Sequence, residues 1–185
     1  MRAGLWIGAI ALSQLFAAPA ALAFLDVRTG LEVNPPAPFV AEDLHRPGHL
    51  SVQINPTTGV PHIGGAHRYL CIVDYLASPR RNKLTQAQVN NIFASKGYLP
   101  VLKQRLESDN LKVLSVGSFD IDGVHGLEAL TLPTNNTGAY NERIFYSYIE
   151  TPKGETELDC FGVAEELDMA LPLFHAIRAS IKPPR

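Results

Sequence analysis

The hydrophobic pattern in the second half of the chain predicts a run of antiparallel strands. Three strand-like segments, 112–132, 142–150 and 156–163, fill most of the stretch from Leu111 to Val163. Asp122-Gly123 is typical of a two-residue hairpin turn with positive φ, and Pro152-Lys153-Gly154 is typical of a reverse turn. The pattern therefore predicts a β-meander, which leads directly into a helical segment at 164–181.

The first half of the chain predicts a few more strands and a helical excursion. Leu31–Asn34 is expected as a short strand at the edge of the sheet, because the prolines that follow it cannot donate ladder hydrogen bonds. Leu50–Ile54 alternates apolar and polar residues, and Arg68–Leu76 has apolar residues on both parities, which indicates a strand covered on both faces. Thr85 with Gln88 forms a capping box at the start of a helix, and a second short helix follows.

The closing segment predicts a helix that packs one apolar stripe. Leu173, Phe174 and Ile177 recur at helical spacing. Pro172 is expected in the first turn of this helix, because an interior proline costs about 3 kcal/mol.

The amino terminus has the features of a secretory signal peptide. Arg2 precedes the apolar run Leu5–Ala18, and Ala21-Leu22-Ala23 gives the small-x-small pattern of a cleavage site. An uncleaved anchor is the alternative, but the apolar run is short for a membrane span. The sequence thus predicts a signal peptide at 1–23, a single domain at 24–185 and a periplasmic or secreted location, without stable membrane insertion after cleavage.

The two cysteines, Cys71 and Cys160, each lie within a predicted strand. Neither lies near a helix amino terminus or beside a basic residue that would lower the thiol pKa. In an oxidising compartment these features predict a structural disulfide between them, with two buried free thiols as the alternative.

Charge and motifs exclude several classes of function. Without the leader, which holds one arginine, the chain has 15 basic and 18 acidic side chains, so nothing indicates nucleic acid or an anionic membrane as a partner. The sequence has no nucleophile elbow, no phosphate-binding loop and no dinucleotide fingerprint, and it indicates no cofactor. The sequence therefore names no catalytic residue.

Four histidines, His45, His49, His62 and His67, fall within 23 residues in two loops. Converging imidazoles could hold Zn²⁺ or Cu²⁺, but no cysteine or carboxylate stands beside them at ligand spacing, so surface histidines are the simpler interpretation. Asp120 with His125 forms either an acid–base unit or an ordinary cross-strand pair. An enzyme site assembled from loop residues would draw on His62, His67 and Asp120.

The carboxyl-terminal pattern resembles one known family. Its most specific part is Leu167-Asp168 with Pro172, Phe174, Ile177, Ser180 and Ile181. Together with the order of elements over residues 24–182, it resembles the PsbP-like superfamily, which includes a photosystem II subunit, a nuclear Ran-binding protein and small exported bacterial proteins. The resemblance implies an α+β fold, an antiparallel β-sheet flanked by helices on both faces in an α/β/α sandwich.

Function follows only in outline from this resemblance, because members of the superfamily mostly bind or stabilise partners and share no active site. We therefore expect an exported, disulfide-stabilised accessory or binding protein of the cell envelope, with an unknown protein or small-molecule partner. The alternative is a metal-binding protein or a loop-assembled enzyme that uses His45, His49, His62 and His67.

Overall fold

Two antiparallel sheets carry the fold in the computed structural model, which describes residues 22–47, 49–134 and 141–185. The smaller sheet has the strand order β1-β2-β10, and the larger one has the order β3-β4-β5-β9-β8-β7-β6. The strands are β1 Phe24–Asp26, β2 Leu31–Val33, β3 Phe39–Asp43, β4 Leu50–Pro56, β5 Cys71–Ala77, β6 Leu111–Ile121, β7 Val124–Pro133, β8 Glu142–Thr151, β9 Gly154–Val163 and β10 Ile181–Lys182. The α-helices are α1 Gln86–Phe93, α2 Tyr98–Ser108 and α3 Leu167–Ala179, the last entered through the 3₁₀ turn η1 Ala164–Glu166.

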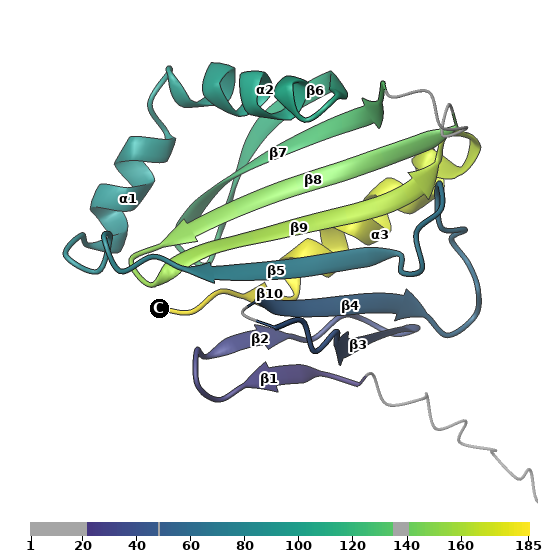
Figure 1. Ribbon diagram of the computed structural model, residues 1–185, viewed down its shortest axis with the longest axis horizontal. Helices are drawn as coiled ribbons and strands as arrows, with labels where there is room; N and C mark the ends of the chain where they lie inside the picture. The colour runs from purple at the N-terminus through teal and green to yellow at the C-terminus, as the bar shows by residue number, and fades with distance from the viewer. Residues whose placement is uncertain (1–21, 48, 135–140) are drawn as a thin grey trace, which may run out of the picture.

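The predicted meander is confirmed as the four consecutive strands β6 to β9 (Figure 1). Asp122 and Gly123 have φ of 49° and 77°, and they set Asp120 opposite His125 as expected. At the next tight turn Thr151 pairs with Gly154, so Gly154 already belongs to β9. Short connections of this kind keep successive strands adjacent, as the sequence predicted.

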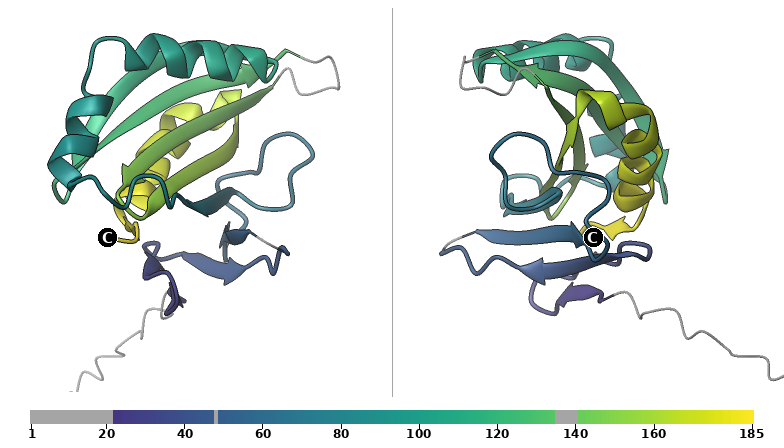
Figure 2. Two further views of the ribbon diagram at one scale, coloured as in Figure 1. Left: turned by 60° about the vertical axis from the view of Figure 1, so that its left-hand side comes forward. Right: turned by 90° about the vertical axis from the view of Figure 1, so that its right-hand side faces the viewer.

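Helices cover both faces of the large sheet. Helices α1 and α2 pack on β7 and β8 through one cluster, in which Phe93 and Leu102 meet Leu127 and Tyr148. Helix α3 packs on the opposite face and lies behind the sheet in Figure 1, and Figure 2 shows the two helical layers from the side. The α+β fold class, an antiparallel sheet flanked by helices on both faces, is confirmed.

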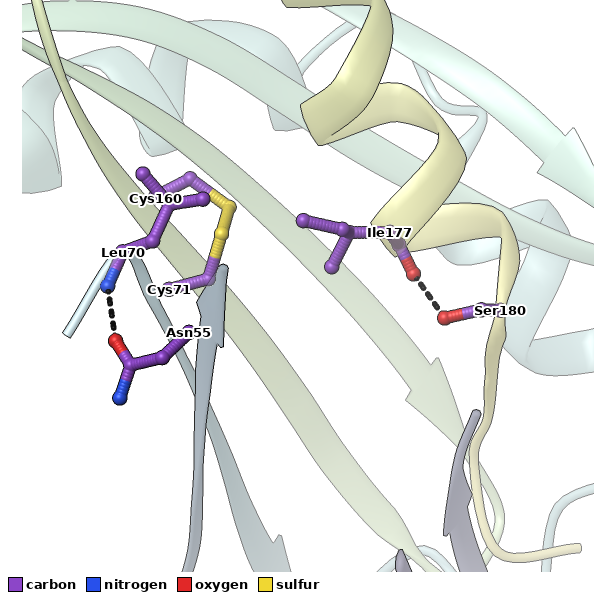
Figure 3. The surroundings of a disulfide bond; sticks show 6 residues. All are labelled: Asn55, Leu70, Cys71, Cys160, Ile177 and Ser180. Carbon is purple, nitrogen blue, oxygen red and sulfur yellow. Dashed lines mark hydrogen bonds between the residues drawn. A yellow bond between two sulfur atoms is a disulfide. The ribbon is translucent and has the colours of Figure 1, made fainter. Parts of the chain in front are cut away.

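The disulfide is also confirmed. Cys71 and Cys160 face each other across β5 and β9, and both are fully buried. Figure 3 shows Ile177 of α3 reaching toward the bridge, which belongs to the core cluster between α3 and the sheet. Cys71 and Cys160 are 89 residues apart in the sequence, and in the chain-entropy model closing a loop of this length stabilises a fold by about 4.6 kcal/mol.

Two local predictions were wrong. Strand β2 is the centre of the small sheet, because β10 returns from the end of α3 to pair with it, so Leu31–Val33 is not an edge of the large sheet. Pro172 lies inside α3 rather than in its first turn. It is exposed and only five residues from the start of the helix, so its missing N–H removes one bond near a terminus, to the Asp168 carbonyl.

The capping box of α1 is confirmed, with Thr85 and Gln88 each accepting from the backbone of the other. The predicted signal segment up to residue 21 lies outside the described residues. Among the residues that the structure describes, no helix is long and apolar enough to span a membrane.

Candidate functional site

The alternation of side chains along β9 separates a buried apolar face from an acidic one. Leu158 and Cys160 belong to the core beneath α3, whereas Glu155, Glu157 and Asp159 point to the opposite face, the one that carries α2. Helices cover only part of this acidic face. No helix crosses in front of β5 and β9 in Figure 1.

A cavity of about 360 Å³ opens on this uncovered part of the face, and Tyr75 and Leu76 lie in its lining beside polar residues. Its charged and hydroxyl lining comes from β4, β5, β9, α2 and the loop before β4, and consists of Ser51, Asp74, Glu155, Glu157, Arg105, Arg46 and His49. We call it the β5–β9 pocket. Since strand pairing sets Ser51 beside Asp74 and Asp74 beside Glu157, adjacent strands place these polar groups in one row.

Hydrogen bonds hold several of the pocket carboxylates. Arg105 of α2 donates to Glu157, with Nη2 to Oε1 at 2.7 Å. The Tyr148 hydroxyl donates to Glu155 Oε2 at 2.6 Å, and the Ser51 hydroxyl donates to Asp74. Among the described residues, Glu157 alone of these three carboxylates has a cationic partner, while Asp74 and Glu155 are bonded by neutral hydroxyls.

Two further groups lie behind the pocket. Burial, together with the carboxylates of Glu157 and Asp74, raises the pKa of Asp159 to about 7. Tyr146 pairs with Asp159 across β8 and β9, and its side chain is 5% exposed. Burial, followed by the nearby carboxylate of Glu157, raises the pKa of Tyr146.

The four candidate histidines are not brought together. His45 pairs with Asp43, with Nδ1 to Oδ2 at 3.1 Å. His62 pairs with Glu166, and His67 pairs with Glu142 and stacks on Phe161 with ring centroids 3.5 Å apart. His49 lines the β5–β9 pocket. Among the described residues there is no group of three or more His, Cys, Asp or Glu side chains that could hold a metal ion.

The residues proposed for a loop-assembled enzyme lie at opposite ends of the sheet. His125 and Asp120 form a pair, with Nδ1 to Oδ1 at 3.0 Å, near the end of the sheet where β8 turns into β9. His67 contacts Glu142, which pairs with Val163 at the other end of the same two strands. Asp120 is also 78% exposed, so the pair has the character of a surface hairpin contact.

Sequence reasoning missed most of the pocket. In the sequence, Glu155, Glu157 and Asp159 alternate with other residues, and this pattern indicates a strand with one acidic face. Asp74 and Arg105 gave no comparable signal, because only strand pairing and helix placement bring them to that face.

Comparison with known proteins supports the fold and gives no information about activity. No protein-family model matches the chain, and a search of curated proteins gives no match either. The chain is similar to the solution structure of cyanobacterial PsbP (CyanoP) from Synechocystis sp. PCC 6803, with a TM-score of 0.55 and 13% identity, over 94% of this chain and 97% of that one. A crystal structure of a protein of unknown function, PA94 from Pseudomonas aeruginosa, described as a putative regulator, gives a TM-score of 0.45 and 8% identity, over 88% of this chain and 96% of that one. The PsbP-like fold that the sequence suggested is therefore shown, and at this identity the likeness extends to the fold alone.

Proposed function

We propose that this chain is an exported binding protein of the cell envelope that holds a small polar ligand in the β5–β9 pocket. The observation that carries the proposal is the pocket itself, because side chains from three strands, a helix and a loop converge there around about 360 Å³ of open space. Its volume is in the lower part of the range typical of small-molecule sites.

Export is supported by two independent features. The apolar leader ends in a cleavage pattern directly before Phe24, where β1 begins. The buried Cys71–Cys160 bridge fits a compartment in which disulfides persist.

Cell fractionation tests the location. The full chain, expressed in a bacterium with a periplasm, should be recovered from the periplasmic fraction starting at Phe24 and with an intact disulfide by mass spectrometry. Recovery of an unprocessed chain starting at Met1, or of a reduced chain in the cytoplasm, would contradict export.

A fragment screen tests the pocket. Small amines, carboxylic acids and polyols are added to the ¹⁵N-labelled mature protein, and amide shifts are followed. We expect hits to perturb β5 and β9 around Asp74 and Glu157. Hits that map only to other surfaces, or a library that perturbs nothing, would show that the pocket is not a binding site.

A further inference from the structure

We infer that the β5–β9 pocket selects an organic cation, a small molecule that carries at least one protonated amine. The inference deepens the proposed function and depends on it, because it names the chemical class of the ligand.

The balance of charge around the cavity is the first argument. Three carboxylates line it, those of Asp74, Glu155 and Glu157, against the two guanidinium groups of Arg46 and Arg105. Arg105 is bonded to Glu157, which leaves Asp74 and Glu155 with hydroxyl donors and, among the described residues, no lysine or arginine partner. A half-enclosed pair of uncompensated carboxylates attracts a cation more strongly than the same pair in open water.

The other two basic residues of the pocket lining are exposed. Arg46 is exposed and donates to the Tyr69 hydroxyl, with Nη2 to Oη at 3.3 Å. His49 is also exposed. Among the described contacts, neither residue bonds to Asp74 or Glu155, so these two carboxylates keep their negative charge without a basic partner.

An ionised carboxylate can accept several hydrogen bonds, so Asp74 and Glu155 can each accept from an ammonium N–H in addition to the hydroxyl that bonds them.

The size of the cavity argues for an organic cation over a bare metal ion. About 360 Å³ is many times the ≈30 Å³ that one water molecule occupies in the liquid. No described group of three ligating side chains gathers there to replace the hydration shell of a metal ion. An amine on a short carbon chain fits this volume.

The test uses two probes of the same chain length and opposite charge. Cadaverine, with a five-carbon chain and two amines, and glutarate, with five carbons and two carboxylates, are titrated into the mature, disulfide-bonded protein at low ionic strength. We expect cadaverine to shift amides of β5 and β9 around Asp74 and Glu157 in a saturable manner, and glutarate to leave them unchanged. Added salt should weaken the cadaverine interaction.

Matched variants assign the interaction to the pocket. Asp74→Asn and Glu155→Gln each remove one negative charge from the lining, and each should raise the dissociation constant for cadaverine about tenfold. Glu107→Gln is the control, because it removes the same charge from the exposed surface of α2, where Glu107 faces Lys103. It should leave the constant within about twofold of wild type. If the amide spectrum of one lining variant shows an altered fold, that variant is set aside and the other one decides the outcome.

Three results would overturn the inference. Glutarate binding in the pocket would keep the proposed function and refute the ligand class. A divalent metal ion that shifts the same amides and displaces cadaverine at equal concentration would replace the organic cation. A cadaverine effect that Glu107→Gln reduces as much as Asp74→Asn does would show that only the overall charge of the protein attracts it.

Discussion

One face of the large sheet has two halves that differ in cover and in chemistry. Over β7 and β8 the face lies beneath α1 and α2, and it presents Leu127, Ala129 and the ring of Tyr148 to the helices. Over β5 and β9 the same face is not covered by a helix, and it presents Asp74 and Glu157 to a cavity. Both halves belong to one continuous sheet, in which β9 pairs directly with β8, so the sheet itself does not separate them.

The difference shows how the end of a helical layer leaves room for a cavity. Under a helix, apolar side chains are stabilised by burial, and an ionised carboxylate would be strongly disfavoured. Where the helical layer ends, carboxylates can keep contact with water while the sheet still holds them in fixed positions. Arg105 stands on this boundary, since it belongs to α2 and bonds Glu157 of the open half.

The largest expected effect lies in the covered half. Leu127 is 1% exposed beneath the helices, so Leu127→Ala should lower the free energy of unfolding by about 3 kcal/mol, through lost burial and a cavity. Urea unfolding measures the loss. Val101→Ala on the exposed side of α2 is the control, with an expected change of about 0.5 kcal/mol or less, since Val101 is 58% exposed. Equal losses in the two variants would mean that α2 does not cover this half in solution.

A smaller effect, a gain in stability, is expected on replacing Asp159, a partly buried carboxylate beside the open half. The native pKa of Asp159 is raised to about 7 from an ordinary value of 3.8, so the folded protein holds a proton that the unfolded chain releases between these values. The stability that this proton provides is present in full below about pH 4 and is lost as the pH rises to about 7.

Asp159→Asn imitates the protonated side chain, and it should therefore match wild type near pH 4 and exceed it at pH 8. Because Asp159 is only partly shielded from solvent, we expect the free energy of unfolding to rise by about 2 kcal/mol at pH 8, which is less than the whole pKa shift would give. Urea midpoints at pH 4, 6 and 8 measure it. A variant whose stability changes with pH just as wild type does would show that Asp159 titrates normally.

The smallest change in stability is expected for Tyr148, whose ring lies in the covered half and whose hydroxyl bonds a carboxylate of the open half. The ring of Tyr148 stacks on Phe93, with centroids 5.5 Å apart, while its hydroxyl donates to Glu155 of the pocket. Tyr148→Phe keeps the ring and removes the bond, so we expect a loss of about 1 kcal/mol in stability. Thermal unfolding can detect this shift, and Glu155→Gln, which keeps an acceptor for the hydroxyl, should lose less. A loss in Tyr148→Phe as large as that in Leu127→Ala would mean that the ring had moved as well.

The predictable part of the fold rests on local patterns. The Asp122-Gly123 turn and the Thr85–Gln88 box act over two to four residues, and both were confirmed. Strand β3 was not predicted, because Phe39–Asp43 is short and follows three prolines, and its place beside β4 depends on pairing. Pro172 was misplaced because local propensity ignores the neighbouring elements that hold α3 together.

From the sequence by itself, periodicity predicted the meander, and the presence of two cysteines in a chain with an export signal predicted the pairing of Cys71 with Cys160. Helices on both faces of the sheet followed from the resemblance to the PsbP-like superfamily. Only the tertiary structure decided that Asp74, Glu157 and Arg105 meet at one cavity, and that His45, His62 and His67 do not meet at all. The reason is physical, because the distance between side chains on different elements depends on strand order and on where a helical layer ends, and neither quantity is encoded in any single stretch of residues.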